Sequence, residues 1–276
     1  MLFQDKTKLL ELYNAISGTN YTDPDILKIV TLENAIYMGL KNDLSLIVLE
    51  IRLHLYEHQS TPNPNMPLRD LLYVADQFSD LTKDMNIYGR KQIKIPSPHF
   101  FVFYNGEEER PDWELQKLSD MYYIEEGHPA LELEVVVLNI NKGHNPQLME
   151  TCQTLREYAE YTDRVRRYAK KMPLREAVEQ AITECIREGI LEDFLKKNRA
   201  EAMKVSIYEY DVRKHIEMER EDSYKDGLTE GRAEMLHQII CTMLSNGRTV
   251  SQIAAELKMD EDSIAEIAGE QKENPA

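Results

Sequence analysis

Two strand-like segments follow each other directly at residues 44–59, and this arrangement limits the fold more than any other feature of the chain. Residues 44–50 are an apolar run of strand length, and residues 52–59 alternate between two faces. One face carries Leu53, Leu55, Glu57 and Gln59, and the other carries His54, Tyr56 and His58. We therefore predict a β-hairpin over 43–59 with its turn at 50–52, although the turn lacks the Asn-Gly pair that is typical of hairpins.

The segments around this hairpin predict an α/β fold. Apolar stripes at helical spacing predict helices over 5–17 and 68–85, and strands are predicted over 32–40, 99–106 and 131–140. The last of these strands is apolar on both faces in its second half, as expected of a covered, central position. The connecting segments are a connector with a weak helical turn (21–30), a proline-rich loop (60–67), a basic stretch (86–98) and an acidic, turn-rich stretch (107–130).

From about Pro146 the apolar spacing becomes helical. Helices are predicted over 146–170, 174–188 and 190–198, whereas 205–210 fits a short strand or a helix equally well. Residues 211–233 are highly charged and predict a solvated helix or a hinge, interrupted by Gly227 and Gly231. We expect three parts: an α/β domain over 1–170, a helical extension with a charged linker over 171–233, and a small helical tail over 234–276.

Composition excludes several classes of protein. The chain has no apolar run of about 18 residues, and its start lacks the pattern of a signal peptide. Its three cysteines lie far apart, which fits a cytoplasmic location and argues against a structural zinc site. The net charge of −16 argues against a protein that coats nucleic acid without specificity, but it permits a local basic groove on an acidic body.

Asp43 and Glu57 are the residues that point most clearly to chemistry. If the hairpin turns near residue 51, the two carboxylates lie at the same end of the strands, about 5 Å apart. Their mutual repulsion favours a divalent cation such as Mg²⁺ between them, and Gln59 is placed to orient a water molecule. The alternative is that Asp43 begins a strand and Glu57 is a surface acid; however, Glu57 follows Leu53 and Leu55 on one face, where a carboxylate needs a partner or an ion.

Five ordered segments, namely KNDLSLIV, LHLYEHQST, NPNMPLRDLLYVADQF, IKIPSPHFFVFYNG and LELEVVVLNIN, resemble the recombination-promoting nuclease family, whose members are also described as transposase-like. That family belongs to the PD-(D/E)XK nuclease superfamily, and the resemblance covers roughly residues 3–170. It implies a restriction-endonuclease-like αβββαβ core with a mixed central sheet, followed by an all-helical extension. It further implies Mg²⁺-dependent hydrolysis of DNA, with Mn²⁺ as a possible substitute, in recombination or mobile DNA.

The resemblance assigns roles to individual residues. Asn42-Asp43 stands at the Pro-Asp of the motif, Glu57 at the acidic position and Gln59 at the lysine, while the backbone carbonyl of His58 would be a further metal contact. Gln59 is a departure from the wider superfamily, because lysine can polarise water with a positive charge and glutamine can only orient it. Family members commonly have more sequence before the region that matches residues 3–5, so part of the first helix is expected to be absent.

Other polar clusters have weaker interpretations. Arg69, Arg90, Lys91 and Lys94 are candidate DNA contacts, the last three beside Tyr88 in a stretch that could equally be a solvated loop. A second basic cluster (Arg164, Arg166, Arg167, Lys170 and Lys171) could be a binding surface or an exposed helix face. Glu33 is a candidate extra acid at the metal, and a serine- or cysteine-based hydrolase is not supported because no nucleophile with a matching base is visible.

The tail over residues 247–266 resembles a helix-turn-helix motif. Its second helix carries Asp260, Glu261, Asp262 and Glu266 and lacks the side chains that read bases, so packing or homo-oligomerisation through these helices is favoured over DNA reading. Two functions therefore stand: a metal-dependent DNA endonuclease, and a catalytically weak or inactive nuclease-fold protein that binds DNA or protein as an oligomeric module.

Overall fold

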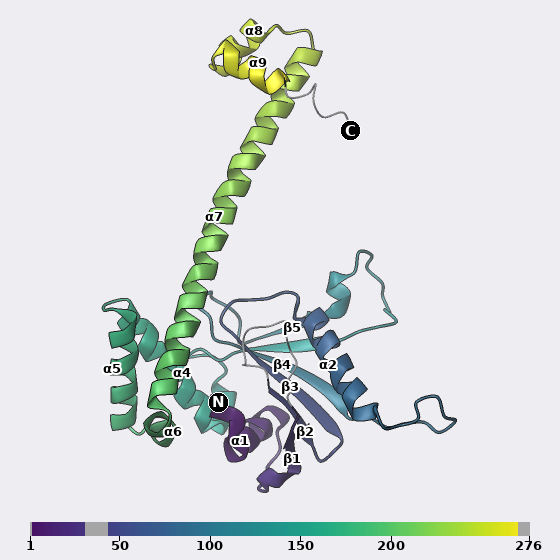
Figure 1. Ribbon diagram of the computed structural model, residues 1–276, viewed down its shortest axis with the longest axis vertical. Helices are drawn as coiled ribbons and strands as arrows, with labels where there is room; N and C mark the ends of the chain where they lie inside the picture. The colour runs from purple at the N-terminus through teal and green to yellow at the C-terminus, as the bar shows by residue number, and fades with distance from the viewer. Residues whose placement is uncertain (1, 31–43, 270–276) are drawn as a thin grey trace. The chain divides into compact units, whose positions relative to one another are not determined.

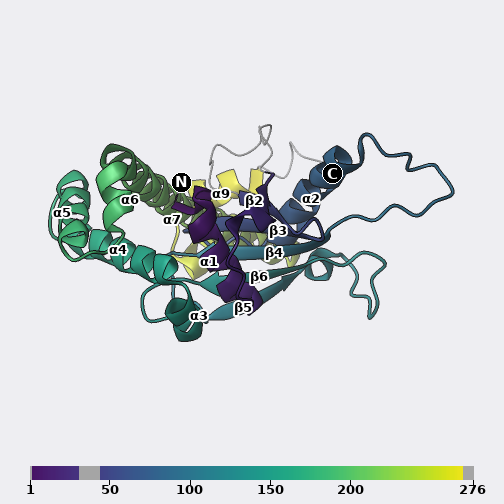
Figure 2. The ribbon, with the colours of Figure 1, turned by 90° about the horizontal axis from the view of Figure 1, so that it is seen from below.

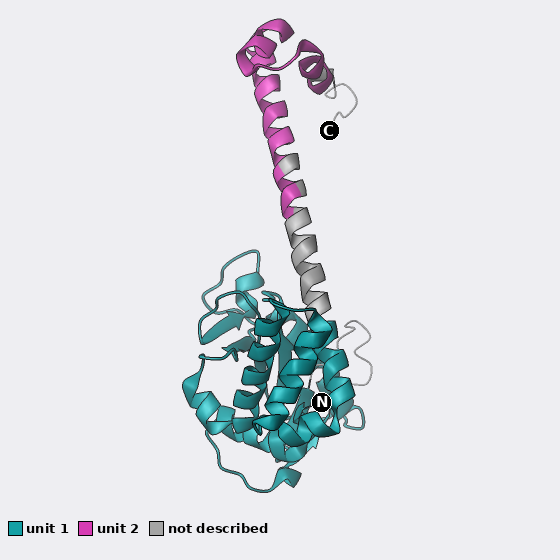
Figure 3. Ribbon diagram, turned by 90° about the vertical axis from the view of Figure 1, so that its left-hand side faces the viewer, with its two compact units in different colours: residues 1–210 teal, residues 211–276 magenta. Residues whose placement is uncertain are grey.

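The computed structural model describes residues 2–30 and 44–269, with the backbone alone for 209–223, 226, 229–230 and 268–269. The chain divides into two compact units, residues 1–210 and 211–276 (Figure 3). The predicted first strand, 32–40, lies outside the described residues, and so do Glu33, Asn42 and Asp43.

Unit 1 is an α/β structure with a mixed sheet, as predicted (Figure 1). Its strands are β1 (Leu27–Ile29), β2 (Leu44–Val48), β3 (Arg52–Gln59), β4 (Ser97–Tyr104), β5 (Trp113–Lys117) and β6 (Glu134–Asn139). Its helices are α1 (Lys6–Ser17), α2 (Met66–Thr82), α3 (Pro146–Thr151), α4 (Gln153–Ala169), α5 (Leu174–Arg187), α6 (Glu192–Lys197) and the first part of α7 (Arg199–Ser245). Short 3₁₀ helices precede α1 and β1, and another directly follows β5.

The described strands lie in the order β1-β2-β3-β4-β6-β5. β1, β2 and β3 form an antiparallel meander, β3 is parallel to β4, β4 is parallel to β6, and β5 is antiparallel to β6. β6 therefore has a partner on each side, which confirms the central position predicted for it. A parallel pair such as β3 and β4 needs a long crossover connection, which residues 60–96 supply with α2.

The hairpin is confirmed, and its turn explains the missing Asn-Gly signal. The register pairs Val48 with Arg52, so the turn lies at 49–51, one residue before the predicted position. Leu49 and Glu50 have φ values of 50° and 60°, and the Ile51 amide donates to Val48 O at 3.1 Å. Two residues at positive φ make the tight turn that suits a hairpin, here without the glycine that usually provides it.

Helices cover both faces of the sheet, and the two faces of β3 predicted from the sequence are confirmed. On one face Leu53, Leu55 and Val102 pack with Met66 and Val74 of α2. On the other face a second cluster joins strands β2, β3 and β4 to α1, α3 and α4; its members include Leu9, Leu12, Tyr13, Leu46, Tyr56, Phe103, Met149 and Leu155. Glu57 and Gln59 share the face of Leu53 and Leu55, which places them under α2.

One predicted helix is wrong in its extent, because 146–170 forms two helices. The backbone of Cys152 is extended, with φ −120° and ψ 94°, and it separates α3 from α4. The first amides of α4 are capped by Glu11 of α1: its Oε1 accepts from Gln153 N at 2.6 Å, and its Oε2 accepts from Thr154 Oγ1 at 2.6 Å. An acid at a helix N-terminus satisfies free amides and the helix dipole, so this long-range contact stabilises the break.

Two strands were missed in the sequence. The predicted connector 21–30 contains β1, which pairs Lys28 with Ile47 of the hairpin. The predicted turn-rich stretch 107–130 contains β5, which pairs Leu115 with Val136 at the outside of β6. Both are short: β1 has 3 residues and β5 has 5, so neither gives a long alternating pattern.

Helices α4, α5, α6 and the first part of α7 share a third hydrophobic cluster, which includes Tyr161, Val178, Ile182, Leu195 and Ala202. Because Tyr161 lies before residue 170 and the other four lie after it, this cluster crosses the boundary predicted at 170. Unit 1 therefore includes most of the segment that the sequence assigned to a separate helical extension.

Unit 2 holds the rest of α7, α8 (Val250–Leu257) and α9 (Glu261–Gly269). The backbone of α7 is one helix through 205–210 and through both glycines that were predicted to interrupt it. Ile240, Ile253 and Ile264 join the three helices in a small core, and Thr249 caps α8 in a reciprocal capping box with Gln252. A helical tail is confirmed, while its use in oligomerisation stays a prediction.

The helices were also compared with what a lipid bilayer requires. Within the described residues, no helix combines the length and the apolar character of a membrane span.

His54 lies in a buried aromatic cluster on the α1 face of β3. Its ring stacks on Phe101 with centroids 5.6 Å apart and lies 5.0 Å from the ring of Tyr13. Its Nδ1 contacts the Tyr56 hydroxyl at 3.3 Å, and its Nε2 is buried without a hydrogen-bond partner among the described residues. Burial, with smaller contributions from His99 and Arg52, lowers the pKa of His54 to about 3.

This cluster predicts a loss of stability in mild acid. A lowered pKa means that His54 stays neutral when folded but is protonated when unfolded, so its contribution is present above about pH 6.5 and is lost as the pH falls towards 3. Between pH 7.5 and pH 5 the free energy of unfolding should fall by about 2 kcal/mol more in the wild type than in His54→Phe. Urea titrations at both pH values measure this, with His128→Phe as the exposed control; equal losses in the wild type and His54→Phe would contradict it.

Candidate active site

Glu57 is a buried acid near the carboxyl end of β3. Its residue is only 8% exposed, and the parallel register places it beside Val102 of β4. It lies under the N-terminal turn of α2, where Met66 is buried. A carboxylate in this position needs a compensating charge or hydrogen bonds, because burial penalises its ionised form.

Arg69 and Gln59 supply this compensation at one oxygen only. The Arg69 guanidinium Nη2 lies 2.8 Å from Glu57 Oε1, and Gln59 Nε2 donates to the same Oε1 at 2.9 Å. Glu57 Oε2 is buried and has no hydrogen-bond partner among the described residues. One oxygen of the carboxylate is thus held in place by two donors, and the other remains available to a ligand.

The electrostatic balance at Glu57 has two opposing parts. Burial raises the pKa of Glu57, and Arg69 and the hydrogen bond from Gln59 lower it in part. Arg69 is itself held by Tyr73, whose hydroxyl lies 3.4 Å from Nη2 and whose ring lies 5.9 Å from the guanidinium carbon. The acid and its counter-charge therefore form a small ordered cluster between β3 and α2.

The second predicted acid, Asp43, lies outside the described residues. The residue that follows it, Leu44, is described, and it pairs with Tyr56 of β3. Tyr56 directly precedes Glu57. Within residues 2–30 and 44–269, no group of three or more His, Cys, Asp and Glu side chains is arranged to hold a metal ion. The metal site predicted at Asp43 and Glu57 thus remains a prediction, with one of its two acids placed.

The side chain of His58 points to the opposite face of β3. Its Nε2 contacts the hydroxyl of Tyr158 in α4 at 3.2 Å. The imidazole of His58 therefore faces away from the side chain of Glu57. The metal contact predicted from the sequence concerns the backbone carbonyl of His58, and this contact stays a prediction.

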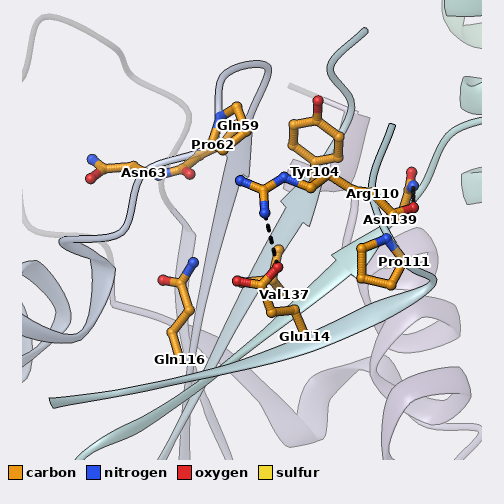
Figure 4. A pocket seen from close by; sticks show the side chains of 10 residues that line it. All are labelled: Gln59, Pro62, Asn63, Tyr104, Arg110, Pro111, Glu114, Gln116, Val137 and Asn139. Carbon is orange, nitrogen blue, oxygen red and sulfur yellow. Dashed lines mark hydrogen bonds and ion pairs between the residues drawn. The ribbon is translucent and has the colours of Figure 1, made fainter. Parts of the chain in front are cut away.

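A pocket opens beside Gln59 at the carboxyl ends of β3, β4 and β6 (Figure 4). It is small, with a cavity volume of about 20 Å³, which is enough for about one water molecule. The pocket is lined by Gln59, Pro62, Asn63, Tyr104, Arg110, Pro111, Glu114, Gln116, Val137 and Asn139. Arg110 pairs with Glu114 across it at 3.2 Å, and Gln116 Oε1 is buried without a partner among the described residues.

The turn after β4 closes this edge tightly. The amide of Asn105 donates to Gln59 O at 2.8 Å, so the strand ends stay in register. A Cβ on Gly106 would lie 2.3 Å from Ser60 O, which means that only glycine allows the two chain segments to approach so closely. The Asn-Gly of this turn was visible in the sequence, but its role beside the pocket was not.

Two arginines of the second basic cluster are held by contacts within unit 1. Arg164 pairs with Glu160 at 2.9 Å and with Glu188 at 2.6 Å. Arg166 donates to Asn141 Oδ1 at 2.6 Å and to Asn105, which ties α4 to the turn after β4. Arg164 and Arg166 therefore pack within unit 1, a role that neither of the two interpretations from the sequence included.

Arg90, Lys91 and Lys94 do not converge with Glu57. They lie between the end of α2 and the start of β4, where Ser97 pairs with Arg52. Val102, the neighbour of Glu57, is five positions further along β4 than Ser97, which corresponds to about 17 Å along the strand. Of the four candidate DNA contacts, only Arg69 lies at the candidate site, and there it is paired with Glu57.

Comparison with family models, with curated proteins and with solved structures finds no match to this chain. The candidate site is therefore interpreted from its own chemistry. A buried carboxylate oxygen without a donor suits a hard cation, the guanidinium suits an anionic substrate group, and an amide at the sheet edge can orient a water molecule.

The Glu57–Arg69 pair predicts strong coupling between the two residues. Arg69→Met should lower the free energy of unfolding by about 3 kcal/mol, because it leaves a buried carboxylate without its counter-charge. In a Glu57→Gln background the same substitution should cost much less. Arg110→Met, which breaks the more exposed pair with Glu114, is the matched control and should change stability by less than about 1 kcal/mol.

Urea titrations followed by circular dichroism would measure all four variants. Additive effects of Glu57→Gln and Arg69→Met would contradict the coupling.

Proposed function

We propose that unit 1 is a metal-dependent endonuclease that hydrolyses phosphodiester bonds in DNA. The observation that carries the proposal is the state of Glu57: one oxygen is fixed by Arg69 and Gln59, and the other is buried without a partner among the described residues. Leaving a buried acceptor unsatisfied is costly, so such an atom calls for a ligand. A cation at Oε2 would satisfy it.

The order of elements supports a nuclease-like core. The described chain runs α1, β1, β2, β3, α2, β4, which is the αβββαβ order implied by the resemblance to recombination-promoting nucleases. The sheet is mixed, with β3 and β4 parallel, and Glu57 and Gln59 both lie at the carboxyl end of β3. A role in recombination or mobile DNA is part of the same proposal.

Each residue of the site then has a distinct task. Glu57 Oε2 and the carboxylate of Asp43 would hold Mg²⁺, with the His58 carbonyl as a further ligand. When bound, Mg²⁺ lowers the pKa of water and neutralises charge that develops on the phosphate. The amide nitrogen of Gln59 keeps Glu57 Oε1 in place and also contacts Met66 Sδ, so its amide oxygen is the atom that would orient the attacking water.

Gln59, which stands at the lysine position of the superfamily motif, carries no charge, and Arg69 of α2 would supply a positive charge near it. Its guanidinium contacts Glu57 and lies within the same turn of α2 that covers the site. A guanidinium suits phosphate oxygens as well as carboxylates, so Arg69 would also be a suitable group to stabilise a bound phosphate.

The proposal predicts loss of cleavage when either acid is neutralised. Glu57→Gln and Asp43→Asn should each lower the rate of cleavage of plasmid DNA in Mg²⁺ by at least about 100-fold, because each removes a ligand charge while keeping the side-chain shape. Gel assays give the rate, and circular dichroism shows whether each variant is folded. Glu126→Gln, at an exposed position, is the control; wild-type rates in folded Glu57→Gln and Asp43→Asn would overturn the proposal.

A second function is favoured by one observation. Within the described residues, Glu57 belongs to no group of three or more His, Cys, Asp and Glu side chains that could hold a metal ion, and Arg69 already neutralises it in part. A catalytically weak or inactive nuclease fold that binds DNA or a protein partner would have these features.

Calorimetric titration with Mn²⁺ distinguishes the two functions. The endonuclease predicts binding of a stoichiometric ion to the wild type and at least about tenfold weaker binding to Asp43→Asn. The inactive module predicts no Mn²⁺ binding to either protein. Equal affinity in the wild type and Asp43→Asn would show that Asp43 is not a metal ligand.

A further inference from the structure

Residues 83–96, which we call the basic loop, project from the sheet beyond the end of α2. Both views of the molecule show the loop extending away from the strands before the chain returns to β4 (Figures 1 and 2). Its ordered contacts are local: Asn86 accepts from the amides of Tyr88 and Gly89 at 3.2 Å and 3.1 Å. A loop of this length inside a compact unit usually serves a binding function.

The basic loop concentrates positive charge on an acidic protein. It contains Lys83, Arg90, Lys91 and Lys94 but only one acid, Asp84, whereas the whole chain has a net charge of −16. Within the described residues none of the four basic side chains forms an ion pair, although most arginines near the core of unit 1 do. Charge that is not neutralised internally is available to an anionic partner.

The same loop exposes apolar side chains. Tyr88 is 94% exposed, Ile87 is 59% exposed and Met85 is 46% exposed. An exposed aromatic ring between basic residues suits unpaired bases, because every base has a face that can stack and every nucleotide carries a phosphate. Paired bases in a duplex offer no free face to Tyr88, so the arrangement favours a single strand.

We propose that the basic loop binds single-stranded nucleic acid, with a base stacked on Tyr88 and phosphates on Arg90, Lys91 and Lys94. This inference rests on the proposed function in one respect: both take nucleic acid as the ligand of unit 1. Because the loop meets β4 about 17 Å from the neighbour of Glu57, it would hold nucleotides other than the one that is cut. The loop therefore sets affinity, and the edge with Glu57 and Gln59 carries out the chemistry.

Binding of a fluorescein-labelled oligothymidylate of about 20 nucleotides, measured by anisotropy on the full chain in EDTA, tests the loop without cleavage. Tyr88→Ala should weaken binding by about 5- to 100-fold, and Tyr88→Trp should restore it. Replacing Arg90, Lys91 and Lys94 together by Gln should reduce the slope of log affinity against log salt concentration by about 2. Tyr123→Ala is the matched control, because Tyr123 is fully exposed but lies beside Glu125 and Glu126.

Wild-type affinity in Tyr88→Ala, or the same loss in Tyr123→Ala, would overturn the inference. So would equal competition by a duplex and by an unlabelled single strand. In Mg²⁺, Tyr88→Ala should raise KM for the oligonucleotide and leave kcat unchanged. A wild type that binds through Tyr88 but does not cleave would overturn the proposed nuclease and keep the loop, whereas cleavage without any effect of the loop variants would do the reverse.

Discussion

The parallel pairing of β3 with β4 determines most of what unit 1 can do. Parallel neighbours cannot be joined by a tight turn, so residues 60–96 must return the chain along the whole length of the strands. α2 makes that return while covering one face of the sheet, and its first turn lies over Glu57. The remainder of the connection, the basic loop, then necessarily lies at the opposite end. One pairing thus separates a buried acidic site from an exposed basic surface.

Much of this arrangement can be predicted from local patterns, because β3 and α2 have strong periodicity. The spacing of apolar residues predicts the two faces of β3, the helix α2, and the strands β4 and β6. Position on a strand also placed Glu57 and Gln59 on one face, and their hydrogen bond bears this out. Where a residue's environment depends on its own segment, sequence reasoning was sufficient.

The failures occur where a distant segment decides the structure. The break at Cys152 depends on Glu11, which caps α4 from 142 residues earlier in the chain. β1 is only 3 residues long and is defined by its pairing with β2. The hairpin turn has Leu49 and Glu50 at positive φ, a conformation in which glycine is the usual residue. At the candidate site, the pairing of Arg69 with Glu57 depends on how α2 lies over β3. Asp43 lies outside the described residues, so the metal site stays a prediction.

The strand order has a consequence for how the chain folds. β5 precedes β6 in the sequence, yet β6 lies between β4 and β5. During synthesis, β4 and β5 therefore emerge before their shared partner. The edges that pair with β6 stay unpaired until residue 139 has been synthesised. Unpaired edges with apolar side chains such as Phe101 and Phe103 are templates for association between chains. The growing chain thus exposes an unpaired sheet edge between the completion of β4 and the insertion of β6, and this interval favours association with other chains.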